Sequence, residues 1–271
     1  MSKTILITGS SSGIGKATAH LFHEKGWNVV ATMRNPQNEQ ELNQLKNALV
    51  TRLDVTDPDT IKSAVSAGVD RFGTIDVLLN NAGYGAFGPL EAFSMEGIRR
   101  QFDTNVIGLL ETTKAVLPLM RKQRSGTIVN ISSIGGKMGF PLGTLYHGTK
   151  FAVEGMSEAL HYELAPLGVA VKIVEPGAIA TDFGGRSFDF TNDESLTEYQ
   201  PIAQKVMSGF ESILDIASPA RVVAEVIWTA VTDGTPTLRY TAGEDAREYI
   251  ANRKALDDAA FFNSVKQIFD L

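Results

Sequence analysis

Two side chains four residues apart suggest proton chemistry on an oxygen atom. Tyr146 and Lys150 are separated by one helical turn, so their side chains lie on one helix face and can interact. The phenol of an unperturbed tyrosine has a pKa of about 10, and a neighbouring ammonium group lowers that pKa by favouring the phenolate. Proton exchange with an alcohol or a ketone then becomes feasible. Ser133 lies thirteen residues before Tyr146, at the end of a predicted strand, where its hydroxyl can hold a substrate oxygen.

A glycine-rich segment near the N-terminus is typical of a dinucleotide-binding turn. It follows the apolar run Thr4–Thr8 and carries glycines at positions 9, 13 and 15. Glycine lets the backbone approach a pyrophosphate closely, and the N–H groups at the start of the following helix favour an anion. The predicted cofactor contacts in this segment are Gly9, Ser11, Ser12, Gly13, Ile14 and Gly15. The same segment also fits the nucleophile turn of an α/β-hydrolase, but all four histidines, at positions 20, 23, 147 and 161, precede residue 162 and leave no late triad partner.

The residue that follows the second predicted strand favours one of the two nicotinamide cofactors. An NAD site places an Asp or Glu there to accept hydrogen bonds from the adenosine ribose, whereas this chain has Arg34. A guanidinium group can pair with a 2′-phosphate and stack on the adenine. NADP(H) is therefore the preferred cofactor, and NAD(H) remains possible.

The elements that must position these residues follow from alternating hydrophobic patterns. Short β-branched runs alternate with helical patterns, which predicts an α/β fold of the Rossmann type: one domain, residues 1–271, with a doubly wound, parallel, seven-stranded sheet and helices on both faces. The predicted strands are Thr4–Thr8, Asn28–Thr32, Leu49–Leu53, Val77–Leu79, Gly126–Ile131, Val169–Val174 and Thr237–Tyr240. The predicted helices are Ile14–Lys25, Asp59–Phe72, Met95–Met120, Leu145–Leu167 and Pro219–Thr232, with a weaker one over Glu39–Lys46. The segment 183–212 is too long for an ordinary connection and is predicted to be a substrate lid, and residues 243–271 are predicted to be a C-terminal helical extension.

The composition excludes several other functions. The chain of 271 residues has no cysteine, which excludes disulfides, thiolate metal sites and a cysteine nucleophile. A net charge of -6 argues against nucleic acid and against a membrane surface as partners. The sequence shows neither a secretion signal nor a bilayer-spanning stretch, so we expect a cytoplasmic protein. His20 and His23 have a spacing that suits two metal ligands, but the lack of a nearby third ligand favours a pair on a helix surface.

Taken together, these motifs resemble the short-chain dehydrogenase/reductase family, in particular its hydroxysteroid and retinol dehydrogenase-like branch. The resemblance covers about residues 3–240 and rests on the glycine loop, Asn80-Asn81-Ala82-Gly83, Ser133, Tyr146 with Lys150, and Pro176-Gly177, in that order. It implies an oxidoreductase that interconverts a ketone or aldehyde and an alcohol by hydride transfer, with NAD(P) as the cofactor.

The resemblance also implies roles for single residues. Tyr146 would be the general acid and base, and Lys150 would lower its pKa and bind the nicotinamide ribose. Ser133 would hydrogen-bond the substrate carbonyl, and Asn105 would hold a water molecule in the proton relay to Lys150. Further implied cofactor contacts are Asp54, Val55, Asn81, Ala82, Gly83, Pro176, Gly177, Ile179 and Thr181. We expect Ser132 to pack rather than react and His147 to face solvent.

The substrate side and the partners are less closely defined. Apolar residues of the loops expected around the nicotinamide favour a hydrophobic carbonyl or alcohol substrate, steroid-like, retinoid-like or aromatic. These residues are Tyr84, Phe87, Ile134, Met138, Phe140, Phe183, Phe188 and Phe190. The resemblance implies a homodimer or homotetramer that associates through the predicted helices 95–120 and 145–167. Two alternatives stay open: an NAD-dependent alcohol dehydrogenase of the same fold, and a dinucleotide-binding sensor without turnover.

Overall fold

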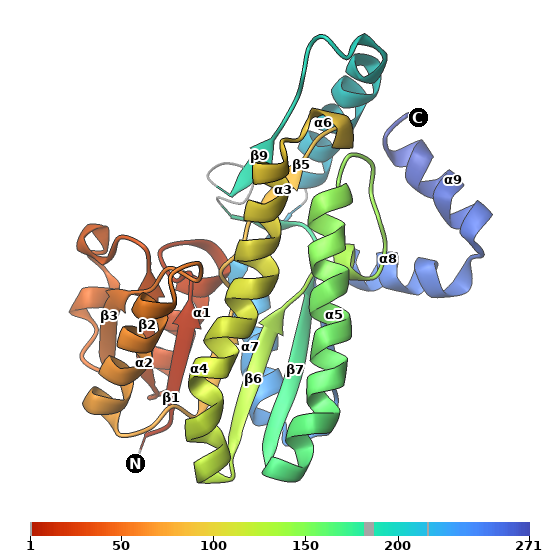
Figure 1. Cartoon of the computed structure of the whole chain (residues 1–271). Coiled ribbons are helices and arrows are strands. Elements are labelled where there is room, and N and C mark those ends of the chain that lie inside the picture. Colours follow the sequence, from red (N-terminus) through yellow and green to blue (C-terminus); the bar gives the residue numbers. More distant parts are fainter. Residues whose placement is uncertain (1, 182–186, 216) are drawn as a thin grey trace.

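Seven parallel strands form the central sheet of the computed structural model, which describes residues 2–181, 187–215 and 217–271 (Figure 1). Their order across the sheet is β11-β7-β6-β4-β1-β2-β3. The strands are β1 (Thr4–Thr8), β2 (Asn28–Met33), β3 (Ala48–Arg52), β4 (Val77–Asn80), β6 (Gly126–Ile131), β7 (Val169–Pro176) and β11 (Arg239–Ala242). The chain changes direction across the sheet between β1 and β4, and such a switch point opens a ligand crevice at the carboxyl ends of the strands.

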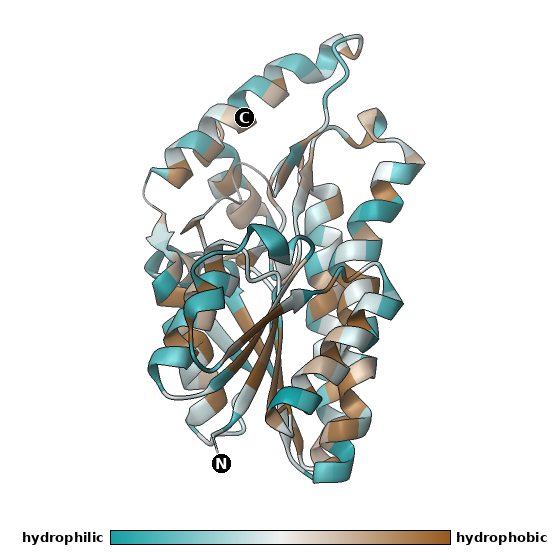
Figure 2. Ribbon diagram, turned by 90° about the vertical axis from the view of Figure 1, so that its left-hand side faces the viewer, coloured by the Kyte–Doolittle hydropathy of each residue, from teal (hydrophilic) through white to brown (hydrophobic). Residues whose placement is uncertain are grey.

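The central strands are mainly apolar because helices cover both faces of the sheet. All five residues of β1 and all four of β4 are buried, and the strands appear as brown ribbons between two layers of helices (Figure 2). Helices α1 (Gly13–Glu24) and α7 (Ala220–Thr232) cover one face. Helices α2 (Pro58–Phe72), α4 (Gly108–Gln123) and α5 (Thr144–Leu164) cover the other face. The predicted parallel seven-stranded sheet with helices on both faces is therefore confirmed.

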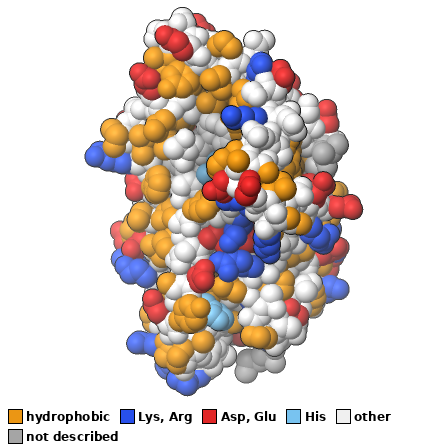
Figure 3. All heavy atoms as spheres, turned by 90° about the vertical axis from the view of Figure 1, so that its right-hand side faces the viewer, with side chains coloured by type: hydrophobic (Ala, Val, Ile, Leu, Met, Phe, Trp, Pro, Cys, Tyr) orange, Lys and Arg blue, Asp and Glu red, His pale blue; other side chains and the backbone are white. Residues whose placement is uncertain are grey.

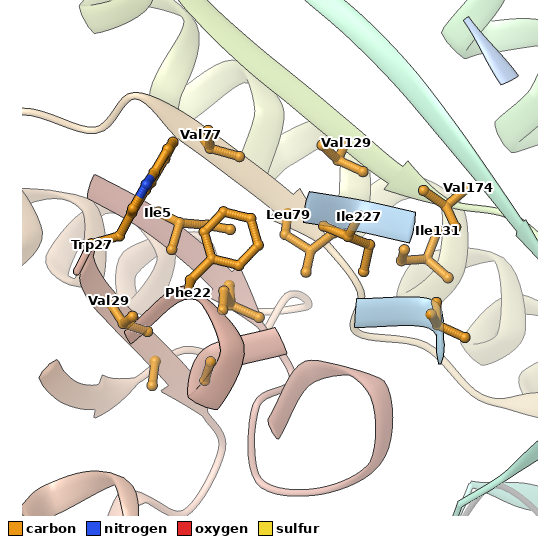
Figure 4. Packing of buried hydrophobic residues seen from close by; sticks show 14 of the residues in the cluster. Ile5, Phe22, Trp27, Val29, Val77, Leu79, Val129, Ile131, Val174 and Ile227 are labelled. Carbon is orange, nitrogen blue, oxygen red and sulfur yellow. The ribbon is translucent and has the colours of Figure 1, made fainter. Parts of the chain in front are cut away.

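Aromatic rings anchor the layer formed by α1 and α7. Phe22 of α1 packs edge-on against Trp27 and against Trp228 of α7, with ring centroids 5.2 Å apart in each pair. Figure 4 shows Phe22 and Trp27 beside Ile5, with Ile227 of α7 farther along the sheet. This packing holds the C-terminal part of α1 against α7 and the sheet.

Two predicted helices differ from the structure. The predicted single helix Met95–Met120 is α3 (Met95–Phe102), a π-helical turn η4 (Asp103–Ile107) and then α4. The predicted helix Glu39–Lys46 was wrong: the chain forms two 3₁₀ turns, η1 (Pro36–Asn38) and η2 (Leu42–Gln44). Here the Glu39 carboxylate accepts hydrogen bonds from the N–H groups of Glu41 and Leu42, which closes the second turn without a longer helix.

A smaller layer lies above the carboxyl ends of the strands. Its elements are β5 (Gly85–Phe87), β8 (Ile179–Ala180), β9 (Phe188–Phe190), α6 (Gln200–Leu214), β10 (Ser218–Pro219), α8 (Glu244–Ala255) and α9 (Asp258–Ile268), with short turns η3 (Leu90–Ala92), η5 (Ile134–Gly136) and η8 (Thr197–Tyr199). The turn η6 (Ala165–Leu167) lies at the opposite edge, where α5 leads into β7. Strand β9 pairs in parallel with β5. Figure 1 shows α6 above the sheet and α8 and α9 beside the upper end of α5. Helix α6 lies within the segment predicted as a lid, whose residues 183–186 fall outside the described residues.

The C-terminal extension is helical, as predicted, but it consists of two helices. Helix α8 ends before Leu256, and Asp257 begins α9 by accepting a hydrogen bond from the N–H of Ala260. Buried residues of both helices pack with α6 and the loop after Ser133 in a third apolar cluster. Across the described ranges, the search for a helix both long and apolar enough to cross a membrane finds none.

Candidate active site

The glycine loop between β1 and α1 is shaped by close backbone contacts. Gly9 and Gly13 have φ values of +70° and +55°, a region that glycine occupies without strain. A Cβ atom at Gly15 would overlap with the carbonyl oxygen of Gly9 and would lie 2.6 Å from Asn81 Nδ2. The three glycines therefore let the loop fold onto the end of β4 and leave its backbone exposed at the mouth of the crevice.

The beginning of α1 fits a dinucleotide phosphate. Ser12 is the N-cap residue, and its side chain makes no capping hydrogen bond to the first turn. N–H groups at a helix start that lack such a cap are suited to an anion. A pocket opens here, lined by Ser11, Ser12, Gly13, Lys16 and Thr181 among others. The exposed backbone, the donor groups and the pocket together match the chemistry of a pyrophosphate.

Residues of the predicted adenosine side lie at the ends of β2 and β3. Arg34 follows β2 and is exposed. Asp54 follows β3, and its Oδ1 atom accepts hydrogen bonds from the N–H and the hydroxyl of Thr56. Val55 is 8% exposed and packs against Gly108, where a Cβ atom would lie 2.7 Å from Val55 Cβ. These three predicted residues share the edge of the crevice on which the adenosine of a Rossmann cofactor lies.

The segment Asn81-Ala82-Gly83 acts as a clamp across the carboxyl ends of β1 and β4. Asn81 Nδ2 donates to the carbonyl oxygens of Thr8 and Gly9, at 2.8 and 2.9 Å. The N–H groups of Asn81 and Ala82 both donate to Thr8 Oγ1 at 3.0 Å. The Asn81 side chain thus holds the glycine loop in place, which is a structural function that the motif alone did not reveal.

The structure brings Ser133, Tyr146 and Lys150 together at the carboxyl end of β6. Ser133 follows β6, and its Oγ accepts a hydrogen bond from the N–H of Gly135 at 3.0 Å. Tyr146 and Lys150 project from the first two turns of α5, with Lys150 Nζ 5.7 Å from the centre of the tyrosine ring. Lys150 Nζ donates to the carbonyl oxygen of Ile131, at 2.9 Å. Ser132 is buried, in agreement with the expectation that it packs.

Burial dominates the protonation of this group. It raises the pKa of the Tyr146 phenol, and the hydrogen bond with Ser133 partly opposes that rise. The direction is opposite to the lowering expected from the lysine alone, because removal of water disfavours a phenolate. Burial also lowers the pKa of Lys150 to about 8, while the Glu154 carboxylate opposes that change. Lys150 therefore remains mainly a cation at pH 7.

Asn105 lies in the π-helical turn between α3 and α4. Its Nδ2 donates to the carbonyl oxygen of Tyr84 at 2.8 Å and to Thr149 Oγ1 at 3.2 Å, while its Oδ1 accepts from the N–H of Tyr84 at 3.0 Å. The side chain therefore joins the turn to the loop after β4 and to α5. A π-helical turn often occurs at functional sites, and the contact with Thr149 places the Asn105 side chain against the turn of α5 that carries Lys150.

Pro176 ends β7, and Gly177, Ile179 and Thr181 lie in the segment that follows it; all four are predicted to lie near the nicotinamide. The geometry of this loop depends on Asp245 of α8, a residue that the sequence did not single out. Asp245 Oδ2 accepts a hydrogen bond from the N–H of Ala178 at 2.7 Å, and a Cβ atom at Gly177 would overlap with this carboxylate. The C-terminal extension therefore fixes the shape of the loop.

We expect Asp245→Ala to weaken cofactor binding by about tenfold, because the Ala178 N–H would lose its buried acceptor and the loop its anchor, a loss of about 1–3 kcal/mol. Fluorescence titration of NADPH with the wild-type and variant proteins measures this change. Asp245→Asn keeps an acceptor oxygen and should recover most of the affinity. Equal affinities of the alanine variant and the wild type would show that the loop does not need this anchor.

Aromatic rings form a wall on the substrate side of Tyr146. Phe87 of β5 lies 5.2 Å from Tyr146 between ring centres, and equally close to Phe188 of β9 and Phe210 of α6. Phe210 in turn packs on Phe269 beyond α9, at 5.4 Å. Phe87 and Phe188 were predicted from the sequence, whereas Phe210 and Phe269 were not. A single sequence gives no sign that α6 and the C-terminus lie over the site. Phe183 lies outside the described residues.

The expectation that His147 faces solvent was wrong. Its side chain is buried between α5 and the loop after Ser133. Nδ1 lies within hydrogen-bond distance of the carbonyl oxygen of Gly135, and Nε2 accepts a hydrogen bond from the N–H of Phe140. His20 Nε2, on α1, lies 3.6 Å from Glu41, and no cluster of three or more metal-binding side chains occurs among the described residues.

Sequence comparisons agree with this geometry. The family model for the short chain dehydrogenase matches residues 3–191. An uncharacterized oxidoreductase of Schizosaccharomyces pombe is 47% identical over 84% of this chain and 96% of its own length. Retinol dehydrogenase 8 of Bos taurus is 33% identical over 88% of this chain and 80% of its own length.

Solved structures are similar over most of the chain. A short-chain dehydrogenase from Streptomyces avermitilis superposes with a TM-score of 0.84 and 34% identity, covering 93% of this chain and 92% of that one. ElxO, solved with NADP bound, has a TM-score of 0.75 and 30% identity, covering 92% of this chain and all of its own. A family match over more than half of the chain, relatives of this identity and the convergence of Ser133, Tyr146 and Lys150 lead to one conclusion. The chain belongs to the short-chain dehydrogenase/reductase family and is an oxidoreductase.

Proposed function

We propose that the protein interconverts a hydrophobic ketone or aldehyde and the corresponding alcohol, with NADP(H) as its preferred cofactor. The observation that carries this proposal is the grouping of Ser133, Tyr146 and Lys150 at the carboxyl end of β6. The pocket at the glycine loop supports the cofactor part of the proposal. When bound, the nicotinamide supplies or accepts the hydride. The protein supplies orientation, a proton and stabilisation of the developing charge on the substrate oxygen.

Each of the grouped residues has a separate task in this proposal. In the reductive direction, Tyr146 Oη donates the proton to the substrate oxygen, and in the oxidative direction it removes that proton. The Ser133 hydroxyl donates a hydrogen bond to the same oxygen. The Lys150 ammonium group contacts the nicotinamide ribose and favours the phenolate after proton transfer, and Asn105 holds the water that returns a proton toward Lys150.

The direct test is turnover on a panel of carbonyl compounds and alcohols, followed by the absorbance of the reduced nicotinamide with each cofactor. Steroid-like, retinoid-like and simple aromatic substrates should be converted, whereas sugars should not. The aromatic wall of Phe87, Phe188 and Phe210 supports this preference, and so does the similarity to a retinol dehydrogenase. Tight NADPH binding without turnover of any compound would instead favour the alternative of a dinucleotide-binding sensor.

The preference for NADP(H) rests on Arg34 and has its own prediction. Arg34→Asp should lower kcat/KM for NADPH and improve it for NADH, so that their ratio shifts by about 100-fold, because a charge-assisted pair with the 2′-phosphate is replaced by repulsion. The similarity to ElxO, which was solved with NADP, supports the proposal. An unchanged NADPH/NADH ratio would show that Arg34 does not contact the 2′-phosphate and would favour the NAD-dependent alternative.

We also propose that residues 187–212 and the C-terminal extension cover the bound substrate. Strand β9 is joined to β5 by backbone pairing and to α3 by the ion pair between Arg100 and Asp189. At the other end, Lys205 of α6 pairs with Asp270 at 3.1 Å. These contacts keep Phe210 against Phe87, so substrate entry requires this cover to move.

Self-association through the segment 95–120 and through α5 is proposed from the apolar side chains that α3, η4 and α5 leave exposed. They are Met95, Phe102, Ile107, Phe151 and Tyr162, each 36% exposed or more. Figure 3 shows apolar side chains among charged ones on the face that carries the C-terminal helices. Sedimentation analysis distinguishes a homodimer from a homotetramer.

A further inference from the structure

His147 lies next to Tyr146 in α5, yet its imidazole binds the backbone of a different segment. Its side chain is buried, and the residue is 7% exposed. Nδ1 lies 2.9 Å from the carbonyl oxygen of Gly135, and Nε2 accepts the N–H of Phe140, also at 2.9 Å. Because an amide N–H can only donate, Nε2 must carry the lone pair and Nδ1 the proton. The imidazole is therefore neutral, and both of its nitrogens are used.

The loop from Ile134 to Gly143 leaves the space that the imidazole of His147 occupies. A Cβ atom at Gly135 would lie 2.8 Å from His147 Nδ1, and one at Gly143 would lie 2.5 Å from His147 Cδ2. Both distances are far below van der Waals contact, so any side chain at either position would displace the imidazole. The two glycines thus form a slot that matches the histidine.

The same loop holds the hydroxyl that is proposed to bind the substrate oxygen. Gly135 donates its N–H to Ser133 Oγ at 3.0 Å, while its carbonyl oxygen accepts from His147. Gly135 is therefore fixed on both sides, by Ser133 and by the imidazole. Ser133 Oγ also donates a long hydrogen bond, of 3.5 Å, to the carbonyl oxygen of Pro176, so the hydroxyl must turn away from this acceptor to donate to a substrate oxygen.

The second hydrogen bond of the imidazole supports the substrate wall. Phe140 donates its N–H to His147, and its ring packs against Tyr249 of α8 at 5.6 Å and Phe269 at 6.3 Å. One side chain therefore connects α5, the Ser133 loop and the C-terminal helices.

We propose that His147 is a positioning residue that acts through two separate hydrogen bonds. Its Nδ1–H orients Ser133 through Gly135, and its Nε2 holds Phe140 in the aromatic wall. This inference rests on the proposed function for its effect on turnover, whereas the two hydrogen bonds themselves can be tested without turnover.

Two variants separate the two bonds. In His147→Asn the side-chain amide reaches the position of Nδ1 and can still donate to Gly135, but it cannot reach Phe140. In His147→Gln the amide reaches the position of Nε2 and can still accept from Phe140, but it cannot donate to Gly135. His161→Asn, a change on the same helix far from the Ser133 loop, serves as the control.

Turnover and amide exchange are then measured on the full-length protein. With a substrate from the panel, His147→Gln should lower kcat by about tenfold or more, because a small misplacement of a catalytic group is costly. His147→Asn should mainly raise KM for the substrate, and His161→Asn should match the wild type. Hydrogen exchange of the Phe140 amide should accelerate in the asparagine variant alone, and exchange of the Gly135 amide in the glutamine variant alone.

The outcomes distinguish this inference from the proposed function. Equal kinetics and equal exchange in the two His147 variants would overturn the positioning role. Selective exchange effects without turnover by the wild-type protein would support the two hydrogen bonds and contradict the proposed function instead. A uniform loss of protection and activity in both variants would mean that His147 only stabilises the fold, which also overturns the inference.

Discussion

Tyr146→Phe should lower kcat for carbonyl reduction by between about 10²-fold and 10⁴-fold, the range attributed to a positioned general acid. The variant lacks the oxygen that exchanges the proton and retains the ring. The ring packs 5.2 Å from Phe87 between centres, so the aromatic wall and the fold should persist. Steady-state kinetics with a substrate from the panel measures the loss.

NADPH binding provides the matched control for this variant. The glycine loop and the Asn81 clamp do not involve the phenol, so the dissociation constant of NADPH should change by less than about threefold, that is, by less than 1 kcal/mol. Retained binding with lost turnover identifies the phenol as the proton donor. Full activity of Tyr146→Phe would contradict the mechanism and would require another acid near Ser133.

The buried position of the phenol adds a prediction about pH. Since burial raises the pKa of Tyr146 in the free protein, its neutral form prevails at pH 7, which is the form needed to donate a proton. Reduction should therefore proceed at neutral pH, and oxidation should become faster as the pH rises and the phenolate forms. A pH profile of kcat/KM in both directions tests this sign.

The central strands could be predicted from the sequence because they are buried on both faces. A run such as Ile5-Leu6-Ile7 allows few structures other than a central parallel strand. The predicted strand boundaries agree to within two residues, including those of the last strand, which begins at Arg239 rather than Thr237. The glycine loop was predictable because its glycines are required locally: Gly9 and Gly13 have positive φ values, and Gly15 has no room for a Cβ atom.

Residues that act through distant parts of the chain could not be predicted in this way. Asn105 interrupts a helix by binding Tyr84, and no helical propensity within 95–120 signals that contact. His147 is buried by a slot in a preceding loop, whereas its helical neighbours alone suggested exposure. Asp245 follows Gly177 by 68 residues, and only the folded structure places its carboxylate against that loop.

The shift of the Tyr146 pKa also depends on distant parts of the chain and could not be predicted. The spacing of Tyr146 and Lys150 shows that an ammonium group is near, and charge alone would lower the pKa of the phenol. The amount of water removed from the phenol depends on Phe87 and on the rings around it, which come from other elements. In this structure the loss of water raises the pKa of the phenol, and the hydrogen bond with Ser133 is the contribution that opposes the rise.

Arg239→Met should reduce the free energy of unfolding by about 3–5 kcal/mol at pH 8, the cost of leaving a buried charge without its partner. Arg239 Nε lies 2.9 Å from Glu154 and 3.6 Å from Glu175, and both carboxylate side chains are at most 6% exposed. One oxygen of each has no hydrogen-bond partner among the described residues. Urea unfolding of the two proteins measures the difference.

Arg253→Met is the matched control. Arg253 is 32% exposed, close to the 30% of Arg239, but its partner Asp258 is 72% exposed. A solvated ion pair of this kind contributes about 0–1 kcal/mol. If the two arginine variants lost the same stability, the two buried carboxylates would not depend on Arg239.

The pH dependence of the free energy of unfolding should identify Glu175 as a buried carboxylate whose charged form Arg239 stabilises. Burial, reinforced by Glu154, raises the pKa of Glu175 to about 7 from its usual 4.5. The folded state therefore holds a proton that the unfolded state releases between these values, so this group makes stability decrease as the pH rises from about 4.5 to 7. Removal of the guanidinium should raise that pKa further and extend the decrease above pH 7.

Glu175→Gln removes this titration and should flatten the decrease in both the wild-type and Arg239→Met backgrounds. Added to Arg239→Met, it should recover part of the lost stability, because only Glu154 would then remain as a buried carboxylate. Glu154 also opposes the lowering of the Lys150 pKa, so it stabilises the cation that the proposed mechanism requires. If the double variant were no more stable than Arg239→Met, the stability lost in Arg239→Met would be due to Glu154 alone. The decrease in the free energy of unfolding between pH 4.5 and 7 would then have to come from a group other than Glu175.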